Sequence, residues 1–213
     1  MPVKKLFYLI SIYLISILGG LVLTIPMEKS PVASNSAVGL FMWPGQAQAA
    51  TTDFDKPPSQ ARAASAQQQT IRLEQQADSF MQQGDSYLEQ KNYPQALSCY
   101  QQALGLYREC GNSRKAASAL LNMGVVYYRQ DAYTEAIARY QEALTTLSTV
   151  DAPSTVALCY RNLGWAHFQQ SQYLEAIRAF ESGLKIYRKL IKPEDEADCL
   201  WGIALSYLNG EEY

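Results

Sequence analysis

The sequence predicts an all-α fold, a right-handed α-solenoid of antiparallel helix pairs that follows an N-terminal hydrophobic segment. Three observations predict it. One motif recurs at a constant interval, its apolar positions have helical spacing, and its two halves are separated by short polar breaks. The array of 61–213 holds about 3.5 repeats, near residues 77–116, 117–156, 157–196 and, in part, 197–213.

The repeat is visible as two ladders of residues in one register. Small residues stand 40 apart at the same point of each first helix, and tyrosines stand 40 apart in the breaks. Composition alone does not produce so many matches in one register, which therefore indicates an internal repeat. The ladders are Gly84, Gly124, Gly164 and Ala204, and Tyr93, Tyr133, Tyr173 and Tyr213.

The pattern of each repeat predicts two helices that pack on each other. In the second repeat, apolar or small residues at spacings of 3, 4 and 7 share one face of each helix. The break at 130–133 is too short for anything but a tight turn, so the two helices must be antiparallel neighbours. Helices are expected near 62–90, 94–109, 113–130, 134–149, 154–170, 174–190 and 194–208.

The small residues have a packing role in this arrangement. A glycine inside a helix costs about 1 kcal/mol relative to alanine, so its recurrence implies that two backbones approach closely while aromatic rings fill the adjoining space. The residues expected to pack the repeats are Gly84, Tyr87, Ala96, Tyr100, Ala103, Gly124, Tyr127, Ala136, Tyr140, Ala143, Gly164, His167, Ala176, Phe180, Gly183, Ala204 and Tyr207.

This pattern resembles the tetratricopeptide repeat (TPR), whose signature is a Leu-Gly-x-x-Tyr helix followed by Ala-x-x-x-Phe. Two features depart from that family. The period is 40 where the usual one is 34, and Arg108, Ser148 and Arg188 stand where a proline usually closes the second helix. Asn122-Met123-Gly124 and Asn162-Leu163-Gly164 are similar to the Asn-Leu-Gly start of peptide-binding scaffold repeats.

Residues 1–60 differ from the array. Residues 6–25 are uncharged and long enough to span a bilayer, and the preceding Lys4 and Lys5 favour a cytoplasmic N-terminus. Ala47-Gln48-Ala49 has the form of a signal-peptidase site. For residues 1–25, an uncleaved transmembrane anchor, a cleaved signal segment and a buried or artefactual segment therefore remain open.

Residues 26–60 hold five of the nine prolines and are expected to be a flexible linker. Both the anchor and the signal interpretation place the repeats on the non-cytoplasmic side of a membrane, in a bacterial periplasm or an equivalent compartment, either exported or membrane-anchored.

Composition argues against catalysis and against nucleic-acid binding. The net charge of −2 lacks the basic excess that phosphate neutralisation requires. The single histidine, His167, occupies a position that other repeats give to tyrosine, so we interpret it as a packing substitution. No metal-ligand or nucleophile motif is present, so we expect no enzyme, no cofactor and no metal site.

The four cysteines are expected to be free thiols. Packed helices lie about 8–10 Å apart, whereas a disulfide requires Cα atoms within about 7 Å. Cys110 lies beside a connection and is the one expected to be most reactive; the others are Cys99, Cys159 and Cys199.

A binding groove is expected on the first helices of the pairs, on the face opposite their partners. Aromatic side chains there can take the side chains of an extended peptide, and asparagine can pair with its backbone. The alternative is that neighbouring repeats cover these aromatics. The groove residues are Asn122, Val125, Tyr128, Arg129, Arg161, Asn162, Trp165, Phe168, Trp201 and Leu205, with Asp78, Met81, Gln82, Asp85 and Glu89 contributed by the first repeat. The TPR resemblance supports this interpretation, since Asn at this place contacts peptide backbone in similar repeats.

These features predict a non-enzymatic protein–protein interaction scaffold that binds a peptide or protein partner. Two alternatives remain, a chaperone-like assembly factor for a membrane complex and a regulatory TPR fragment of a longer protein. The last helix would expose Leu200, Ile203, Ala204 and Tyr207 if no helix follows it, so possible self-association through this helix is a further expectation.

Overall fold

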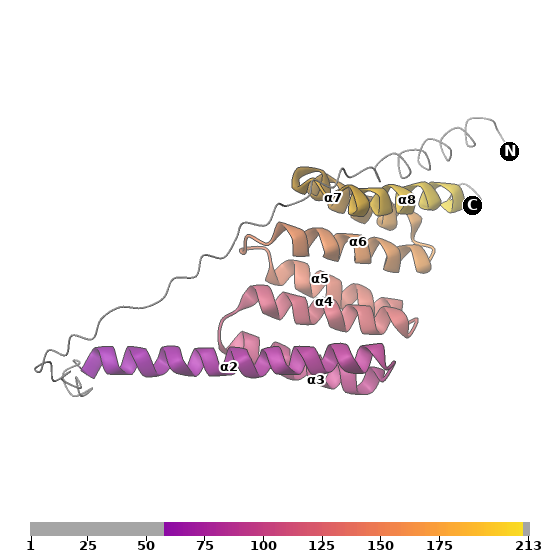
Figure 1. Cartoon of the computed structure of the whole chain (residues 1–213). Helices are drawn as coiled ribbons and strands as arrows, with labels where there is room; N and C mark the ends of the chain where they lie inside the picture. The colour runs from indigo at the N-terminus through magenta and orange to yellow at the C-terminus, as the bar shows by residue number, and fades with distance from the viewer. Residues whose placement is uncertain (1–57, 211–213) are drawn as a thin grey trace, which may run out of the picture.

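The computed structural model describes residues 58–210, and within that range every regular element is an α-helix (Figure 1). Consecutive helices pack as antiparallel pairs in one stack, which confirms the predicted all-α solenoid. The helices are α2 (Pro58–Glu89), α3 (Tyr93–Glu109), α4 (Ser113–Arg129), α5 (Tyr133–Thr146), α6 (Pro153–Gln169), α7 (Tyr173–Leu190) and α8 (Pro193–Gly210).

Most helix ends lie within a residue or two of the expected ones, with exceptions at two places. Helix α2 begins at Pro58, so the end of the predicted linker, 58–60, is helical. Proline suits the start of a helix because the first turn leaves its N–H groups unpaired. Helix α5 ends at Thr146 instead of near 149. Residues 147–152 are followed by Pro153, which disfavours helical backbone just before it.

The expected anchor or signal segment at 1–25 and nearly all of the linker lie outside the described residues. Among the helices from residue 58 to residue 210, none is long and apolar enough to cross a bilayer.

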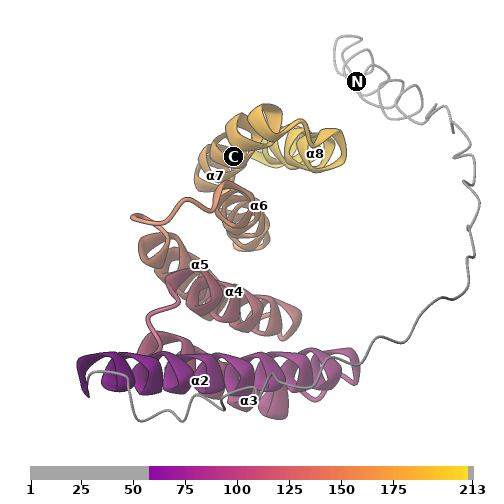
Figure 2. The same cartoon turned by 60° about the vertical axis from the view of Figure 1, so that its left-hand side comes forward.

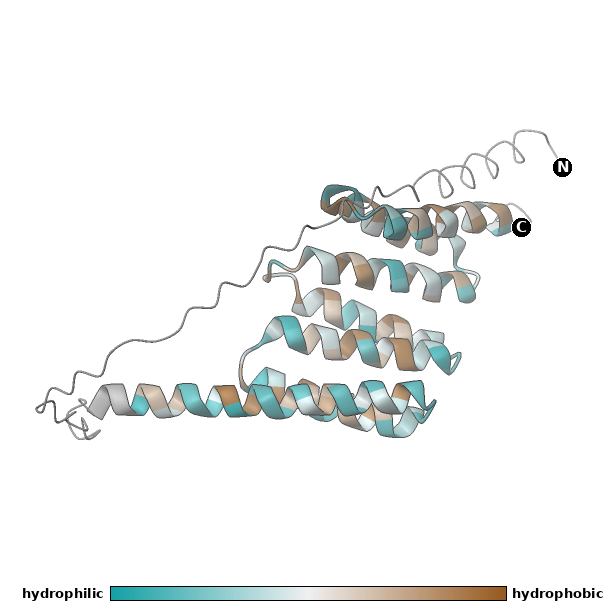
Figure 3. Ribbon diagram, viewed as in Figure 1, coloured by the Kyte–Doolittle hydropathy of each residue, from teal (hydrophilic) through white to brown (hydrophobic). Residues whose placement is uncertain are grey.

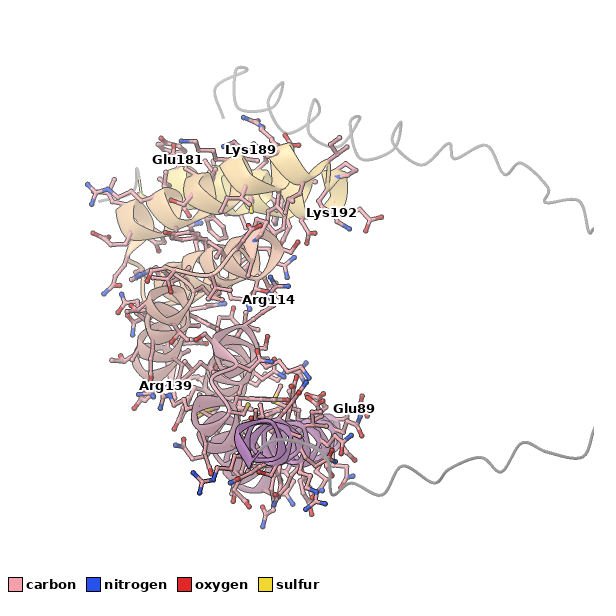
Figure 4. The ribbon with its side chains drawn as sticks, turned by 90° about the vertical axis from the view of Figure 1, so that its left-hand side faces the viewer. Glu89, Arg114, Arg139, Glu181, Lys189 and Lys192 are labelled. Atoms are coloured by element: carbon pink, nitrogen blue, oxygen red, sulfur yellow. The ribbon has the colours of Figure 1, made fainter. Side chains whose placement is uncertain are left out.

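The stack curves, and the first and second helices of the pairs lie on opposite sides of the curve. Figure 2 shows α4, α6 and α8 along its hollow side, with α5 and α7 outside them. In Figure 4, Arg114 at the start of α4 faces the open side of the curve, whereas Arg139 of α5 points outward from the convex side. Polar and apolar residues alternate along each helix (Figure 3), as expected for helices that bury one face.

The three turns inside the pairs share one backbone conformation. Lys91, Asp131 and Ser171 occupy the same place in successive repeats and have φ angles of 58°, 58° and 59°. In each turn the next residue donates its N–H to a carbonyl at the end of the preceding helix, such as Ala132 to Tyr127 at 3.0 Å. This closing bond satisfies a carbonyl that the helix end would otherwise leave unpaired.

Each glycine of the ladder lies against an aromatic ring of its partner helix. A Cβ added to Gly84 would fall 2.8 Å from Cδ1 of Tyr100, and one added to Gly164 would fall 2.7 Å from Cδ1 of Phe180. Real Cβ atoms essentially never show contacts below 3.0 Å. The predicted alanines of the second helices are completely buried: Ala96, Ala103, Ala136, Ala143 and Ala176.

Other residues of the predicted packing set lie nearer the surface. Tyr87, Tyr127 and His167 are half-buried, and Nδ1 of His167 lies 2.6 Å from Oε1 of Gln172. Gly183 faces α6, since its added Cβ would meet the carbonyl oxygen of Ala157 at 3.3 Å.

The outer side of α8 departs from the expected packing. Ala204 is buried as expected, but Tyr207 is 53% exposed because no described helix covers that face of α8. Trp201 on the same helix is 42% exposed. Self-association through this helix stays a prediction.

All four cysteines of the described region are free thiols. Burial raises the pKa of both Cys159 and Cys199 to about 12, so these thiols stay protonated near neutral pH. Cys110 alone is half-buried.

Candidate peptide-binding groove

The hollow side of the stack contains three places where successive first helices meet. We refer to α2 against α4 as the first junction, α4 against α6 as the second, and α6 against α8 as the third. Because successive repeats are offset by 40 in the numbering, positions 85, 125 and 165 are equivalent in the three junctions.

The first junction is closed by side chains of the chain itself. The Asp85 carboxylate accepts a hydrogen bond from the Tyr100 hydroxyl at 2.7 Å and one from the Asn122 amide at 3.1 Å. Earlier in α2, the Asp78 carboxylate accepts from Lys115 at 2.8 Å and from Tyr107 at 2.6 Å. These bonds tie α2, α3 and α4 together.

In the first junction, Asp78 and Lys115 each change the pKa of the other. Burial alone would raise the pKa of Asp78, but hydrogen bonds from Lys115 and Tyr107 outweigh it and lower that pKa. Burial alone would lower the pKa of Lys115, but its bonds to Asp78 and Glu74 outweigh it and raise that pKa. Both shifts mean that the folded state favours the charged pair.

The third junction is also closed. The Arg161 guanidinium lies 2.5 Å from Oδ1 of Asp195 and 3.5 Å from Oδ2 of Asp198, two carboxylates of α8. The indole of Trp165 packs on Phe180, with ring centroids 5.1 Å apart, and its Nε1 lies 3.4 Å from Asp198.

The second junction is open and forms a cavity of about 460 Å³. Gln169 of α6 donates a hydrogen bond to the Tyr128 hydroxyl of α4 at 3.2 Å and so bridges the two helices beside it. The lining is mainly apolar, with an amide and a guanidinium at its surface. It consists of Val125, Tyr128, Arg129, Tyr140, Asn162, Trp165 and Gln169.

The predicted groove residues are therefore distributed over all three junctions and α8. Five of them line the one cavity of the second junction: Val125, Tyr128, Arg129, Asn162 and Trp165. Asn122 donates a hydrogen bond to Asp85 in the first junction, and Arg161 forms an ion pair with Asp195 of α8 in the third. Each of these two residues therefore links its own repeat to a neighbouring one.

The remaining groove predictions lie at the margins of this site. Phe168 packs edge-on against Trp165 and Tyr173, at centroid distances of 5.8 and 5.7 Å. Leu205 of α8 is half-buried, and Trp201 is exposed. The alternative that neighbouring repeats cover the aromatics has support at Trp165, whose indole lies against Asp198 of α8, whereas the aromatic contacts of Phe168 are within its own repeat.

The sequence predicts a different role for one cavity residue. It predicts that Tyr140 packs against Gly124, yet this tyrosine also lines the cavity. The sequence does hold a sign that Tyr140 lines a cavity, because position 125 is Val where the first repeat has Asp85. That sign can be interpreted only once the structure shows that Asp85 contacts Tyr100, the tyrosine equivalent to Tyr140.

Further cavities lie away from the second junction. One of about 420 Å³ lies between the start of α7 and the end of α8, beside Tyr173, Ile177 and Tyr207. In residues 58–210, no group of three or more His, Cys, Asp or Glu side chains is placed to hold a metal ion.

Stacked antiparallel helix pairs with a repeating glycine–aromatic contact and a hollow side define a helical repeat protein. The tetratricopeptide repeat family model matches residues 75–149 and 116–189, which together cover more than half of the chain. The chain belongs to the tetratricopeptide repeat family.

Solved structures share this fold at low sequence identity. The apo form of RapI is similar over 66% of the chain, with a TM-score of 0.62 and 15% identity. BtubC (BKLC) from P. vanneervenii is similar over 64% of the chain, with a TM-score of 0.58 and 22% identity. The chain spans only 39% and 57% of the lengths of these two proteins. No curated protein matches the sequence.

Proposed function

We propose that this chain is a non-enzymatic scaffold that binds an extended peptide segment of a protein partner in the second junction. Membership of the TPR family supports the general class, a protein–protein interaction scaffold. The observation that carries the finer proposal is the 460 Å³ cavity between α4 and α6. The other two junctions, by contrast, are closed by the chain's own side chains.

The lining of the cavity suits a peptide. Val125, Tyr128 and Trp165 offer apolar and aromatic surface for a side chain. Asn162 makes no side-chain hydrogen bond with any other described residue, so its amide can donate to and accept from a peptide backbone. Peptide-binding sites commonly combine apolar contacts with a few placed polar groups of this kind.

The proposal is tested by capture from solubilised membranes with the purified full-length chain as bait. A Val125→Lys, Asn162→Ala variant puts a cation into the apolar lining and removes the amide, and Glu181→Lys changes an exposed residue of α7 (Figure 4). Partners bound by the wild type and by Glu181→Lys should be lost from the cavity variant, with circular dichroism unchanged. Equal capture by all three would contradict a role for the cavity.

The captured material also separates the scaffold from an assembly factor. A scaffold should bring down complete complexes, whereas an assembly factor should bring down incompletely assembled subunits. The first outcome supports the function proposed here, and the second favours the alternative.

We further propose that the repeats lie on the non-cytoplasmic side of a membrane, exported or membrane-tethered. The support is the apolar sequence at 6–25 behind two lysines. Cys110 provides the test, because it is the one half-buried thiol among the four. A membrane-impermeant maleimide should label it in cells whose inner membrane is intact, and should not label Cys110→Ser. Labelling that requires lysis would contradict this location.

A further inference from the structure

The hydroxyl of Tyr140 lacks the partner that its counterpart has. Tyr100 and Tyr140 occupy equivalent positions in successive repeats, and each lies against the glycine of its own pair. The Tyr100 hydroxyl donates to Asp85. Tyr140 makes no hydrogen bond from its side chain within residues 58–210, because Val125 stands where the first repeat has Asp85.

This hydroxyl also reaches the cavity. Tyr140 is 1% exposed and lines the second junction. Within the described region, no side-chain oxygen or nitrogen is both fully buried and unpaired. The small exposed part of Tyr140 is therefore its hydroxyl, at the surface of the cavity. Burial raises the pKa of Tyr140, which keeps the hydroxyl protonated and able to donate.

The second donor of the first junction recurs in the second. Asn122 donates its amide to Asp85, and Asn162 occupies the equivalent position and lines the cavity. Arg129, at the same cavity, adds a positive charge. The second junction thus retains both hydrogen-bond donors that surround Asp85 but contains no carboxylate among its lining residues.

We propose that the second junction binds the side-chain carboxylate of an acidic residue of the partner, which takes the place that Asp85 holds in the first junction. This rests on the proposed peptide-binding function and specifies one residue of the peptide. Tyr140 and Asn162 donate to the carboxylate oxygens, and Arg129 compensates the charge. A desolvated carboxylate requires such hydrogen bonds and a countercharge, so a neutral residue gains less from the site.

The third junction supports the assignment by contrast. There Phe180 replaces the tyrosine, Gly202 replaces the asparagine and Trp165 fills the position of Asp85. An added Cβ at Gly202 would lie 2.5 Å from the Phe180 ring, so this junction has neither the tyrosine nor the asparagine donor and no room for a side chain at position 202. The carboxylate-binding arrangement is therefore expected at one junction only.

Two variants test the assignment, and each introduces a residue that another repeat of this chain already has at the equivalent position. Val125→Asp reproduces the first junction by supplying an internal carboxylate next to Tyr140 and Asn162. Tyr140→Phe removes the hydroxyl and reproduces the ring that the third pair carries at Phe180. Both changes therefore place a side chain at a position where this fold already accommodates it.

The probe is a display library of random linear peptides, selected on the immobilised full-length chain. Wild type should enrich peptides with Asp or Glu at one fixed position, and Val125→Asp should lose that preference. In a synthetic version of an enriched peptide, acetylated and amidated at its ends, Glu→Gln should weaken binding about tenfold or more. On Tyr140→Phe the same exchange should have a markedly smaller effect.

The outcomes separate this inference from the function beneath it. Enriched peptides without a fixed acidic position would overturn the inference and leave peptide binding standing, as would an acidic preference that persists in Val125→Asp. Binding that requires a free C-terminal carboxylate and is lost on amidation would also overturn it. A selection that enriches no peptide would contradict the peptide-binding function and the inference together.

Discussion

The ring of Tyr140 lies directly against the Cα atom of Gly124, so a Cβ added there would fall 2.7 Å from Cδ1 of the tyrosine. The ring cannot easily move away, since Tyr140 is almost completely buried. The contact fixes both the distance between α4 and α5 and the place at which the hydroxyl meets the cavity. A packing contact in the core thus positions a group at the candidate site.

Gly124→Ala should therefore destabilise the protein, by about 1–3 kcal/mol. Helix propensity alone would favour alanine by about 1 kcal/mol, so the sign of the change tests the steric argument. Chemical denaturation monitored by circular dichroism measures it. Gly105→Ala in α3 is the matched control, because an added Cβ there meets nothing within 4 Å. The control should raise the free energy of unfolding by about 0.5–1 kcal/mol.

Ile191→Gly should stabilise the fold. Ile191 follows α7 with a φ of 54°, in the left-handed region that is costly for a β-branched residue by about 1–2 kcal/mol. The equivalent position two repeats earlier is Gly111, a glycine with a φ of 74°. Thermal melts should show a higher midpoint for Ile191→Gly and a lower one for Gly111→Ala. A melt for Ile191→Gly at or below that of wild type would contradict the strain at this turn.

The Asp78–Lys115 contact should make stability depend on pH at the acidic end. Because the folded-state pKa of Asp78 lies below its usual value of 3.8, the carboxylate contributes stability above that value and loses it as the pH falls through the lowered pKa. Asp78→Asn should be less stable than wild type at pH 7, and the difference should shrink as the pH falls below about 4. Urea denaturation of both proteins across this range provides the measurement. A difference in free energy of unfolding that stays constant with pH would show that Asp78 does not stabilise the fold through its charge.

Arg161→Met should loosen the attachment of α8. The guanidinium side chain is 24% exposed and contacts two carboxylates of α8, so its loss leaves Asp195 and Asp198 without their countercharge. Amide hydrogen exchange should accelerate in α8 and remain unchanged in α4. Arg108→Met is the control, because Arg108 pairs with Glu142 at a more exposed site and such pairs contribute little. Equal exchange in α8 for both variants would contradict the role given to Arg161.

The architecture is predictable because its determinants are local and repeat. A constant register of small and aromatic residues predicts helix pairs, and the glycine ladder identifies which faces approach. The predicted end of α5 is too late because the longer connection at 147–152 has no counterpart in the other repeats. The left-handed residues Lys91, Asp131 and Ser171 are not glycines, so the sequence gives no sign of their conformation, which the structure shows together with the closing hydrogen bonds of the turns.

The sequence predicts which helical faces form the candidate site, but it does not predict the contacts that the residues on those faces make with other repeats. Five of the ten groove residues line one cavity, as the helical face suggests. The prediction that Arg161 is available in the groove misses its partners on α8, which are distant in the sequence and depend on how closely α8 approaches α6. The contact of Asp85 with Tyr100 and Asn122 likewise depends on the meeting of three helices.

Site-specific photo-crosslinking tests the central claim, that a partner peptide lies in the second junction, most directly. A photoreactive amino acid at Gln169, beside the cavity, should form an adduct with a discrete partner in native membranes. The same group at Glu181, on the exposed surface of α7, should form none (Figure 4). Mass spectrometry should locate the Gln169 adduct in one short segment of the partner. Adducts from Glu181 in place of Gln169, or from both positions alike, would contradict binding in this groove.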